Sequence, residues 1–384
     1  MPLPSPFEIL LYDKNREYQG VLPALPTLQF TPRHNQQDSG VIALSANHPA
    51  ALDLANLGTH IAVYHKGEFL MSGACRLLSS TGLRNRQMLE FQVQGHWRLL
   101  ANMLGWQVPT GTYVPGTVNQ SGKEYDVRTG PAETVYKGFV QANAARLGLP
   151  VVVEPSQGRG STITVQSRMH SLTDRLFPLV DQAGIGTRVR LDGGVYRVEA
   201  YAPRTFAPVI DASGGVLSDI NWTRTPPDAT RAVVQGPGEG TARIHRLVVD
   251  AALEAQWGDI LEVPVDARDI DMDDPQRDAL MEARGRERLA VGATKHGISI
   301  SIQQGKGLDY STAGVLVGDL MKFELTAGTD PVVDVLRSAT LSYDRRTGPR
   351  FVPQVGEQSM HPIEGLYRGV TQALKSLRNY GSRN

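Results

Sequence analysis

The sequence predicts a multidomain, β-rich α+β protein in which two β regions flank a small α/β module. Three observations lead to this prediction. Short β-type runs fill the chain up to about residue 94 and return after about residue 229. Two amphipathic helical segments with marked ends lie between the β regions. The length of 384 residues exceeds one ordinary core and favours two to four domains.

The first β region is predicted over residues 1–105. Its runs are "FEILLYD", "IAVYHKG", "EFLMSGACRLLS" and "MLEFQVQG", separated by glycine, proline and asparagine. The "HKGE" between two runs predicts a tight hairpin, and the alternation of Leu89, Phe91 and Val93 places one face inward. We therefore expect a small β-barrel or sandwich here, followed by a glycine- and proline-rich extended loop or arm over residues 106–130.

The α/β module is predicted over residues 131–222. Pro131 suits a first helical turn and Gly148 a helix end, so a helix is expected between them. Its apolar stripe consists of Ala132, Val135, Tyr136, Phe139, Val140, Asn143 and Leu147. The strands "VVVEP" and "STITVQS" follow.

A second helix should begin near Ser171, which has capping-box spacing to Asp174. Its expected buried face is Leu172, Leu176, Leu179, Val180 and Ala183. Pro178 predicts a kink or an early end of this helix. A hairpin turning at residues 192–194 completes the module, and residues 203–228 have the composition of a linker.

The second β domain is predicted over residues 223–355, with an inserted helix near 275–290 that carries Glu282 and Arg286 at i,i+4 spacing. Residues 356–384 contain a short basic amphipathic helix. Because neither this tail nor the arm at 106–123 has enough local core to fold alone, we expect both to contact other subunits or partner proteins.

Composition excludes several classes of partner. Lys plus Arg equals Asp plus Glu at 39 each, so no overall charge attracts nucleic acid or anionic membranes. The single Cys75 forms no internal disulfide, which suits synthesis in a reducing cytoplasm. The first residues, "MPLPSPFEILLYDKN", make a poor signal peptide, and no apolar run reaches about 18 residues. We expect no signal-dependent export and no stable membrane association.

Glycine-rich segments do not support a nucleotide site. The "GPGEG" at residues 236–240 is followed by strand-like alternation where a dinucleotide fold would open a helix, so we expect a turn or bulge. The "GTVNQSGKE" segment has Glu124 where a phosphate-binding loop needs Ser or Thr. No cofactor is predicted.

The metal and nucleophile motifs also fail. In "DIDMDD", residues 269–274, Asp274 stands at the glycine position of a calcium loop and Leu280 at its glutamate position. We expect these acids to cap and charge-complement the N-terminus of the helix that starts at Pro275, with weak cation binding as the alternative. His60 and His65, on an expected strand edge, lack metal-site spacing, and Cys75 with His96 lacks a local nucleophile motif. No catalytic, cofactor-binding or metal residue is therefore predicted.

The chain resembles the tail-tip or baseplate hub (minor tail protein) family of actinobacterial long-tailed phages. The resemblance rests on five ordered stretches between about residues 7 and 325: "FEILLYDKN" with "LQFTPR", "GHWRLL", "RTGPAETVYKGFVQANA", "GPGEGTARI" with "EVPVDARDI", and "ARGRERLA" with "GLDYSTAGVLVGDLMKFEL". Pro237 and the extra Ser-Thr-Ala-Gly before "VLVGDL" depart from the family pattern.

The family is similar in fold to the hub proteins of contractile-tailed phages. The resemblance implies a structural virion protein: a homotrimer with two β-barrel domains per chain that adapts a sixfold tail tube to a threefold tip. It also implies a channel for the tape measure protein and for DNA in transit, with the distal tail protein ring and central-spike proteins as neighbours. Closed rings form through heterologous contacts.

Two other hypotheses remain open. Glycoside hydrolysis depends on the spatial separation of two carboxylates, which a sequence does not show, so a tail-associated cell-wall hydrolase is one alternative. The aromatic residues between Trp97 and Tyr113, including Trp106, suggest a host-glycan-binding tail protein as another.

Overall fold

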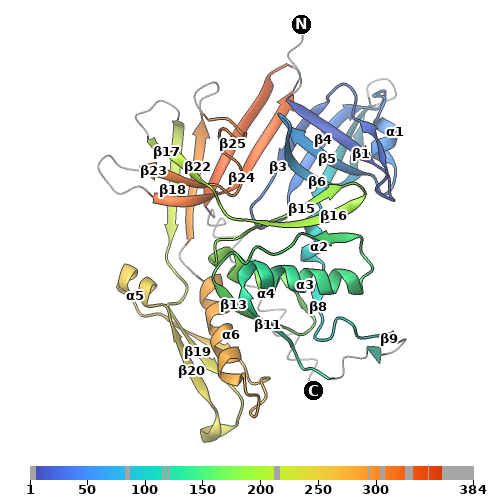
Figure 1. The fold of residues 1–384 in the computed structure, drawn as a ribbon. Coiled ribbons are helices and arrows are strands. Elements are labelled where there is room, and N and C mark those ends of the chain that lie inside the picture. Colours follow the sequence, from blue (N-terminus) through green and yellow to red (C-terminus); the bar gives the residue numbers. More distant parts are fainter. Residues whose placement is uncertain are drawn as a thin grey trace.

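The structure of the protein is a computed structural model that describes residues 6–82, 87–114, 117–118, 122–211, 217–292, 295–302, 308–324, 332–344 and 346–356. The strands of both β regions lie together at one end of the molecule (Figure 1). Below them lie a middle α/β part with helices α3 and α4, and a separate small unit that contains α6. The order β, α/β, β along the chain is therefore not an order of layers in space, because the two β regions lie side by side.

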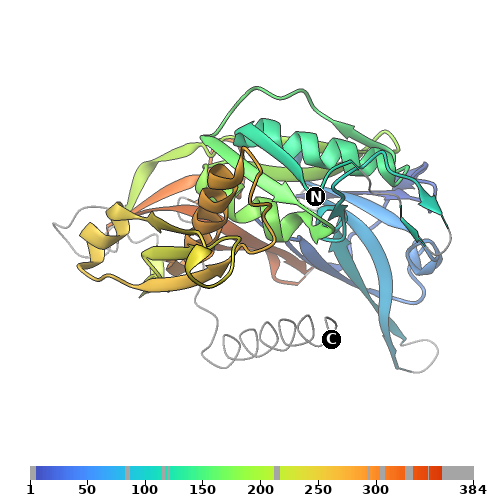
Figure 2. The ribbon, with the colours of Figure 1, turned by 90° about the horizontal axis from the view of Figure 1, so that it is seen from below.

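The first β region contains the strands that the sequence predicts and three that it misses. Its elements are β1 (Phe7–Tyr12), β2 (Tyr18–Val21), β3 (Thr27–Thr31), β4 (Ser39–Ser45), α1 (Ala51–Ala55), β5 (His60–His65), β6 (Glu68–Thr81), β7 (Met88–Gly95) and α2 (Arg98–Ala101). The predicted hairpin is confirmed: Lys66 and Gly67 join β5 to β6 with φ of 51° and 83°. Phe91 and Val93 are buried, as the alternation predicts. Figure 2 shows the far end of the β6–β7 hairpin projecting from the body.

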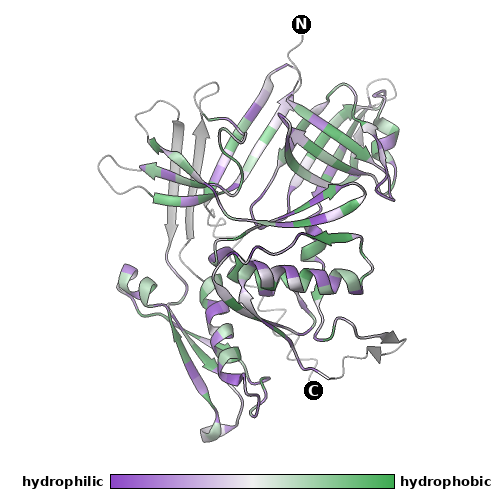
Figure 3. Cartoon of the chain, in the orientation of Figure 1, coloured by the Kyte–Doolittle hydropathy of each residue, from purple (hydrophilic) through white to green (hydrophobic). Residues whose placement is uncertain are grey.

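The middle part packs two helices against three small sheets. Its elements are β8 (Leu104–Gly105), β11 (Asp126–Pro131), α3 (Ala132–Arg146), β12 (Val151–Val153), β13 (Thr162–Ser167), β14 (His170–Ser171), α4 (Leu172–Gln182), β15 (Gly186–Asp192) and β16 (Val195–Tyr201). Hydrophobic and hydrophilic residues alternate around α3 in Figure 3, and its apolar face lies in the core. The predicted helices and the β15–β16 hairpin are thus confirmed.

Two local predictions in this part are wrong, and of the kink or early end expected at Pro178 the early end does not occur. Leu147 is 46% exposed because it lies beyond the last turn of α3. Ser171 makes no side-chain cap hydrogen bond and instead bonds the Thr173 hydroxyl, so no capping box forms. Pro178 does not end α4, which continues to Gln182, because the buried side chains on either side of the proline hold the helix in the core.

The second β region includes strands where the sequence predicts a linker. Its strands are β17 (Thr205–Asp211), β18 (Leu217–Thr225), β22 (Lys295–Ile302), β23 (Leu320–Glu324), β24 (Val332–Asp344) and β25 (Gly348–Gly356). The linker prediction over 203–228 is wrong because β17 and β18 find their partners, β23 and β22, about 70 to 120 residues further along the chain.

The two expected β-barrels are replaced by one open sheet. The Leu341 position of β24 pairs with Phe30 of β3, so the two β regions join edge to edge. The order along the sheet starts at β18 and ends at β2, and among the described strands no sheet closes into a barrel. The prediction of two closed β-barrels is therefore wrong. Strands of the two β regions pair with each other, and neither region closes on itself.

A small unit is inserted between β18 and β22. It consists of β19 (Arg231–Gln235), the 3₁₀ turn η2 (Gly240–Ala242), β20 (His245–Val249), α5 (Ala251–Trp257), β21 (Glu262–Asp266) and α6 (Arg277–Val291). The helix α6 confirms the one predicted near 275–290 and covers the three-stranded sheet β20–β19–β21. Gly285 permits this close approach, because a Cβ there would lie 2.5 Å from Cγ2 of Val248.

The arm is held to the body at its base. Trp106 donates its backbone N–H to Oδ1 of Asn143 (3.1 Å), and the Arg146 guanidinium lies 4.2 Å from the Trp106 ring centroid. Farther out, β9 (Tyr113–Val114) and β10 (Thr117–Val118) pair with each other, away from the body in Figure 1. Residues 357–384, with the predicted tail helix, lie outside the described residues. The domain boundaries at 105, 130, 222 and 355 stay predictions.

Candidate functional site

Cys75 and His96 do not form a catalytic pair. Both nitrogens of the His96 ring are engaged: Nδ1 hydrogen-bonds Oγ of Ser72 (2.8 Å) and Nε2 hydrogen-bonds Nδ1 of His60 (3.0 Å). Burial raises the pKa of the Cys75 thiol to about 12, so it stays protonated at neutral pH. Cys75 is a small buried core residue, as the sequence suggests.

The histidines serve the core. His60 and His65 are 9% and 5% exposed, and their strand β5 pairs with β1 on one side and β6 on the other, so the strand-edge prediction is wrong. Burial, with nearby Arg16, lowers the pKa of His60 to about 4. Nowhere in the described part of the chain do three or more His, Cys, Asp or Glu side chains gather as a possible metal site.

The glycine loop and the acidic run have structural uses. The "GPGEG" loop and η2 join the antiparallel strands β19 and β20, as the turn prediction states. The capping prediction for residues 269–274 is wrong: α6 begins at Arg277 with Gln276 as a cap residue that makes no side-chain bond. Asp274 instead accepts from the Gln276 N–H (2.7 Å), and Asp269 pairs with Arg284.

Asp181 connects three distant parts of the chain. This residue of α4 uses one oxygen, Oδ1, to accept from Nδ2 of Asn35 (2.9 Å) in the β3–β4 connection and from Nη1 of Arg337 (2.7 Å) on β24. Nε2 of His34 lies 3.2 Å from the same oxygen. We call these four residues the Asp181 joint. It holds together the first β region, the middle helices and the second β region.

Asn35 links the Asp181 joint to Ile185 and Thr187, at the start of β15. This residue has a left-handed φ of 52°, which asparagine tolerates, and is 7% exposed. Its Nδ2 also donates to the Ile185 carbonyl, and its Oδ1 accepts from the backbone N–H and the hydroxyl of Thr187 (2.9 Å each). Despite burial, hydrogen bonds and charge from His34 and Arg337 hold the pKa of Asp181 well below its usual range, so it is ionised at neutral pH.

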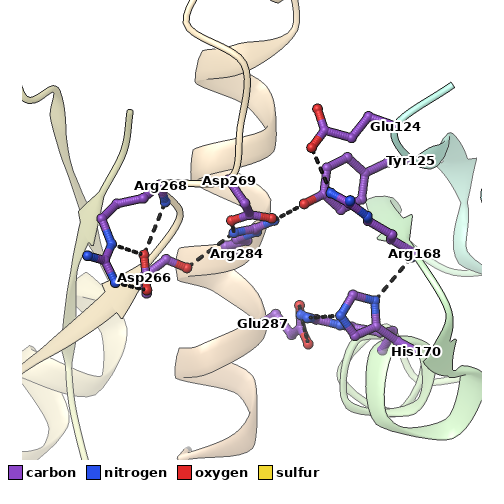
Figure 4. A network of polar contacts seen from close by, with 10 residues as sticks. Glu124, Tyr125, Arg168, His170, Asp266, Arg268, Asp269, Arg284 and Glu287 are labelled. Atoms are coloured by element: carbon purple, nitrogen blue, oxygen red, sulfur yellow. Dashed lines mark hydrogen bonds and ion pairs between the residues drawn. The ribbon is translucent and has the colours of Figure 1, made fainter. Parts of the chain in front are cut away.

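A second polar contact attaches the inserted unit to the middle part (Figure 4). Arg284 of α6, 8% exposed, donates to both carboxylate oxygens of Asp269 and to the Asp266 carbonyl (3.2 Å). It also reaches the Tyr125 hydroxyl at 3.4 Å, on the side of β11. This contact and the neighbouring one at Glu287 are called the α6 joint.

Glu287 makes the other half of the α6 joint. Both of its carboxylate oxygens accept from Nη1 of Arg175 on α4 (3.0 Å each), and Nη2 of Arg175 lies 3.1 Å from Nε2 of His170. Burial and three neighbouring arginines, Arg175 first among them, lower the pKa of His170 to about 4. His170 is therefore neutral at pH 7, with Nδ1 accepting from the Arg168 backbone N–H (3.1 Å) and the ring hydrogen on Nε2.

Both joints suit mechanical connection better than catalysis. Arginine, asparagine and carboxylate groups saturate one another, and charge-assisted hydrogen bonds of this kind position segments firmly. No residue of the Asp181 joint was predictable from a motif, since none occurs around His34, Asn35, Asp181 and Arg337. The one available signal was Asp181 itself, an acid beside the apolar face of a predicted helix.

Comparison with known families identifies the chain. The model of the family described as Siphovirus ReqiPepy6 Gp37-like protein matches residues 8–357. The chain belongs to this family. A search by sequence among curated proteins gives no match.

Solved structures with low sequence identity share the fold of this chain. A 43 kDa tail protein of prophage MuSo2 from Shewanella oneidensis is 13% identical, with a TM-score of 0.53 over 91% of this chain and 98% of that one. A tail protein from Neisseria meningitidis is 11% identical, with a TM-score of 0.53 over 92% and 97%. The prophage tail protein gp18 from Listeria monocytogenes is 10% identical, with a TM-score of 0.52 over 96% and 99%.

The resemblance predicted from the sequence is thus confirmed at the level of a siphovirus family with the fold of phage tail proteins. Within the described residues, no helix of this Gp37-like protein has the length and apolar content needed to span a membrane.

Proposed function

We propose that this Gp37-like protein is a structural virion component of a phage tail that serves as the baseplate or tail-tip hub. One observation carries the proposal: the fold matches three phage tail proteins over nearly the whole length of both chains, at least 91% of this one and 97% of each of them. A catalytic role has no comparable support, because the candidate nucleophile Cys75 is protonated and buried.

In the proposed assembly, three copies close a ring through heterologous contacts. Each chain contributes two β regions, so six β regions surround the axis and match a sixfold tube, while the trimer matches a threefold tip. The open ends of the large sheet at β2 and β18 support this arrangement, since unpaired edges are available to other chains. The channel passes the tape measure protein and then DNA, and the distal tail protein ring and central-spike proteins are the neighbours.

Within this assembly, the arm and residues 357–384 make contacts with other subunits or partners. The isolated β9–β10 pair supports this role for the arm, because it is joined to no other described sheet. Deleting residues 363–384 should give a chain that folds but fails to assemble. Circular dichroism checks the fold, and electron microscopy of tails from a phage carrying the deletion checks assembly. Normal tails with the shortened protein would contradict this prediction.

Two of the aromatic residues that suggested glycan binding already have partners within the chain. Trp97 is 7% exposed and donates its indole N–H to Oγ1 of Thr187 (3.1 Å), and the Trp106 ring stacks with Arg146. Both rings are therefore engaged inside the chain. Glycan binding that is abolished by Trp106→Ala would restore that alternative.

The hub proposal is tested on purified virions. Gold-labelled antibody against the chain should mark the tail tip, and quantitative mass spectrometry should give three copies per tail. A label along the tube, or tails with normal tips from a phage that lacks this chain, would contradict the proposal. Zymography on host cell wall tests the hydrolase alternative, and activity lost on changing one carboxylate would support it.

A further inference from the structure

A cavity of about 280 Å³ lies where the β3–β4 connection, the β5–β6 hairpin, β15 and the segment around Tyr310 meet. Its accessible lining is mostly polar. The volume is close to the lower limit of ligand pockets, about 300 Å³, so the space suits a molecule of the size of one sugar or one amino acid. The cavity adjoins the Asp181 joint, because the hydroxyls of its lining residues Tyr201 and Thr187 hydrogen-bond His34 and Asn35 (2.9 Å each). The cavity does not depend on the proposed tail role.

Arg188 is a cation of this cavity that has neither an ion-pair nor a hydrogen-bond partner among the described residues. Its guanidinium lies over the Tyr201 ring at 5.2 Å and over the Phe69 ring at 5.9 Å from the centroids. Among the described residues, no carboxylate comes within 4.0 Å of it and no hydrogen bond satisfies its N–H groups. By contrast, Arg190 on the same strand pairs with Glu199 at 3.2 Å.

The other charged groups of the wall are already engaged. Nη1 of Arg33 donates to the Gln37 carbonyl (2.9 Å) and to Oγ of Ser39 (3.0 Å). The Arg33 backbone N–H donates to Oδ1 of Asp38 (2.7 Å). Glu68 accepts from the Thr312 hydroxyl. Arg188 thus remains as the group that can receive an anion from solvent.

An apolar surface accompanies this cation. Tyr64 and Phe69 line the cavity from the two strands of the β5–β6 hairpin, with ring centroids 5.8 Å apart. Aromatic rings beside a few polar groups are typical of sites that orient small ligands. A ligand that reaches Arg188 therefore also contacts a ring wall.

We propose that this cavity binds a carboxylate ligand, of the size of a monosaccharide or amino acid, held in a bidentate pair by Arg188. A planar guanidinium matches a carboxylate through two parallel hydrogen bonds. A phosphate dianion would bring two negative charges close to Asp38 and Glu68, which line the same cavity. The ligand body packs on Tyr64 and Phe69. The carboxylate is the shared chemistry of an acidic sugar and an acidic amino acid.

The binding test uses the full chain and isothermal titration calorimetry. Glucuronate and glutamate are the carboxylate probes, and glucose and inorganic phosphate are the matched controls. We expect glucuronate or glutamate to bind at least tenfold more tightly than either control, and whichever probe binds better identifies the source. No binding of either carboxylate, or equal binding of phosphate, would overturn the proposal.

Two variants sharpen the test. Arg188→Gln should weaken binding of the carboxylate at least tenfold, while Arg197→Gln, which removes an arginine paired with Glu154 and Asp192 outside the cavity, should leave it unchanged. Circular dichroism confirms that each variant folds. Unchanged binding to folded Arg188→Gln would overturn the assignment, and the glucuronate-to-glucose comparison on the unaltered chain stands without any variant.

The pH dependence of binding gives an independent check. Burial raises the pKa of Asp38 to about 7, although Arg33 and Arg188 oppose this. Its neighbours across the cavity are Glu68 of β6, Arg188 and Arg190 of β15, and the tyrosines Tyr64, Tyr201 and Tyr310. Because Asp38 is neutral below pH 7, glucuronate should bind several-fold more tightly at pH 6 than at pH 8, and Asp38→Asn should remove that difference. A pH dependence that persists in Asp38→Asn would contradict the carboxylate arrangement.

Discussion

The Asp181 joint and the α6 joint connect parts of the same chain by opposite means. At the Asp181 joint, one carboxylate oxygen receives donors from two segments that lie 146 and 156 residues away in sequence. At the α6 joint, each arginine has its own carboxylate: Arg284 has Asp269 and Arg175 has Glu287. The Asp181 joint therefore depends on a single carboxylate oxygen, whereas the α6 joint consists of two separate ion pairs.

This difference predicts different responses to damage. Loss of a shared acceptor leaves several donors unsatisfied at once, whereas loss of one pair in a distributed contact leaves the other pair intact. The first joint holds the large sheet to the middle helices, while the second holds only the inserted unit. Substitutions at the first should therefore affect the whole molecule, and substitutions at the second should affect residues 231–291.

The largest effect is expected for Asp181→Ala. It removes the acceptor shared by Asn35 and Arg337 and leaves a guanidinium that is 20% exposed without its anion, which costs about 3 kcal/mol or less. Urea unfolding should show this loss, and limited proteolysis should show cleavage in more than one region. Asp181→Asn, which keeps an oxygen acceptor without the charge, should lose less. If Asp181→Ala and the unaltered chain have the same free energy of unfolding, the Asp181 joint does not stabilise the fold.

A smaller and more local effect is expected for Arg284→Ala. Asp269 is 38% exposed and is hydrated when its partner is removed, so the loss should be about 2 kcal/mol or less. Hydrogen exchange should quicken in α6 and β21 while α3 keeps its protection. If exchange quickens equally in the first β region, the two joints are coupled and the proposed contrast fails.

The same contrast explains what the sequence could predict. The helix α3 was predictable because its signals, Pro131, Gly148 and the apolar stripe, are all local. The hairpin at Lys66 and Gly67 was predictable for the same reason. Local capping was predicted less well, since Ser171 has the right spacing but bonds Thr173 instead.

What the sequence could not show are the pairings between distant segments. The contact of β24 with β3 joins residues about 310 apart and turns two expected barrels into one sheet. The Asp181 joint depends on the same long-range arrangement, because His34 and Arg337 reach one carboxylate only after that sheet forms. No periodicity within one segment encodes such a contact.

Mild acid should act on the α6 joint through His170. Its pKa in the folded chain is about 4, below the ordinary 6.5, so the unfolded chain binds the proton first and stability falls as pH drops from about 6.5 toward 4. Hydrogen exchange in α6 at pH 7 and pH 5, extrapolated to equal intrinsic rates, should show this loss. His170→Gln removes this titration and should flatten the pH dependence. Burial also lowers the pKa of His34, so His34 contributes to the same loss of stability in acid. The test therefore compares His170→Gln with the unaltered chain at each pH.

The smallest effect is expected on the solvent side of α6. Arg286 is 64% exposed and pairs with Glu282 at 2.6 Å, the i,i+4 pair that the sequence predicts. Glu282 also pairs with Arg246 at 2.7 Å, so it keeps a partner when Arg286 is removed. Arg286→Ala should therefore change the free energy of unfolding by about 0.5 kcal/mol or less. Arg284 and Arg286 lie two residues apart on one helix, so their alanine variants change helix propensity alike. If Arg286→Ala destabilises the chain as much as Arg284→Ala does, helix propensity, and not the α6 joint, sets the stability of the inserted unit.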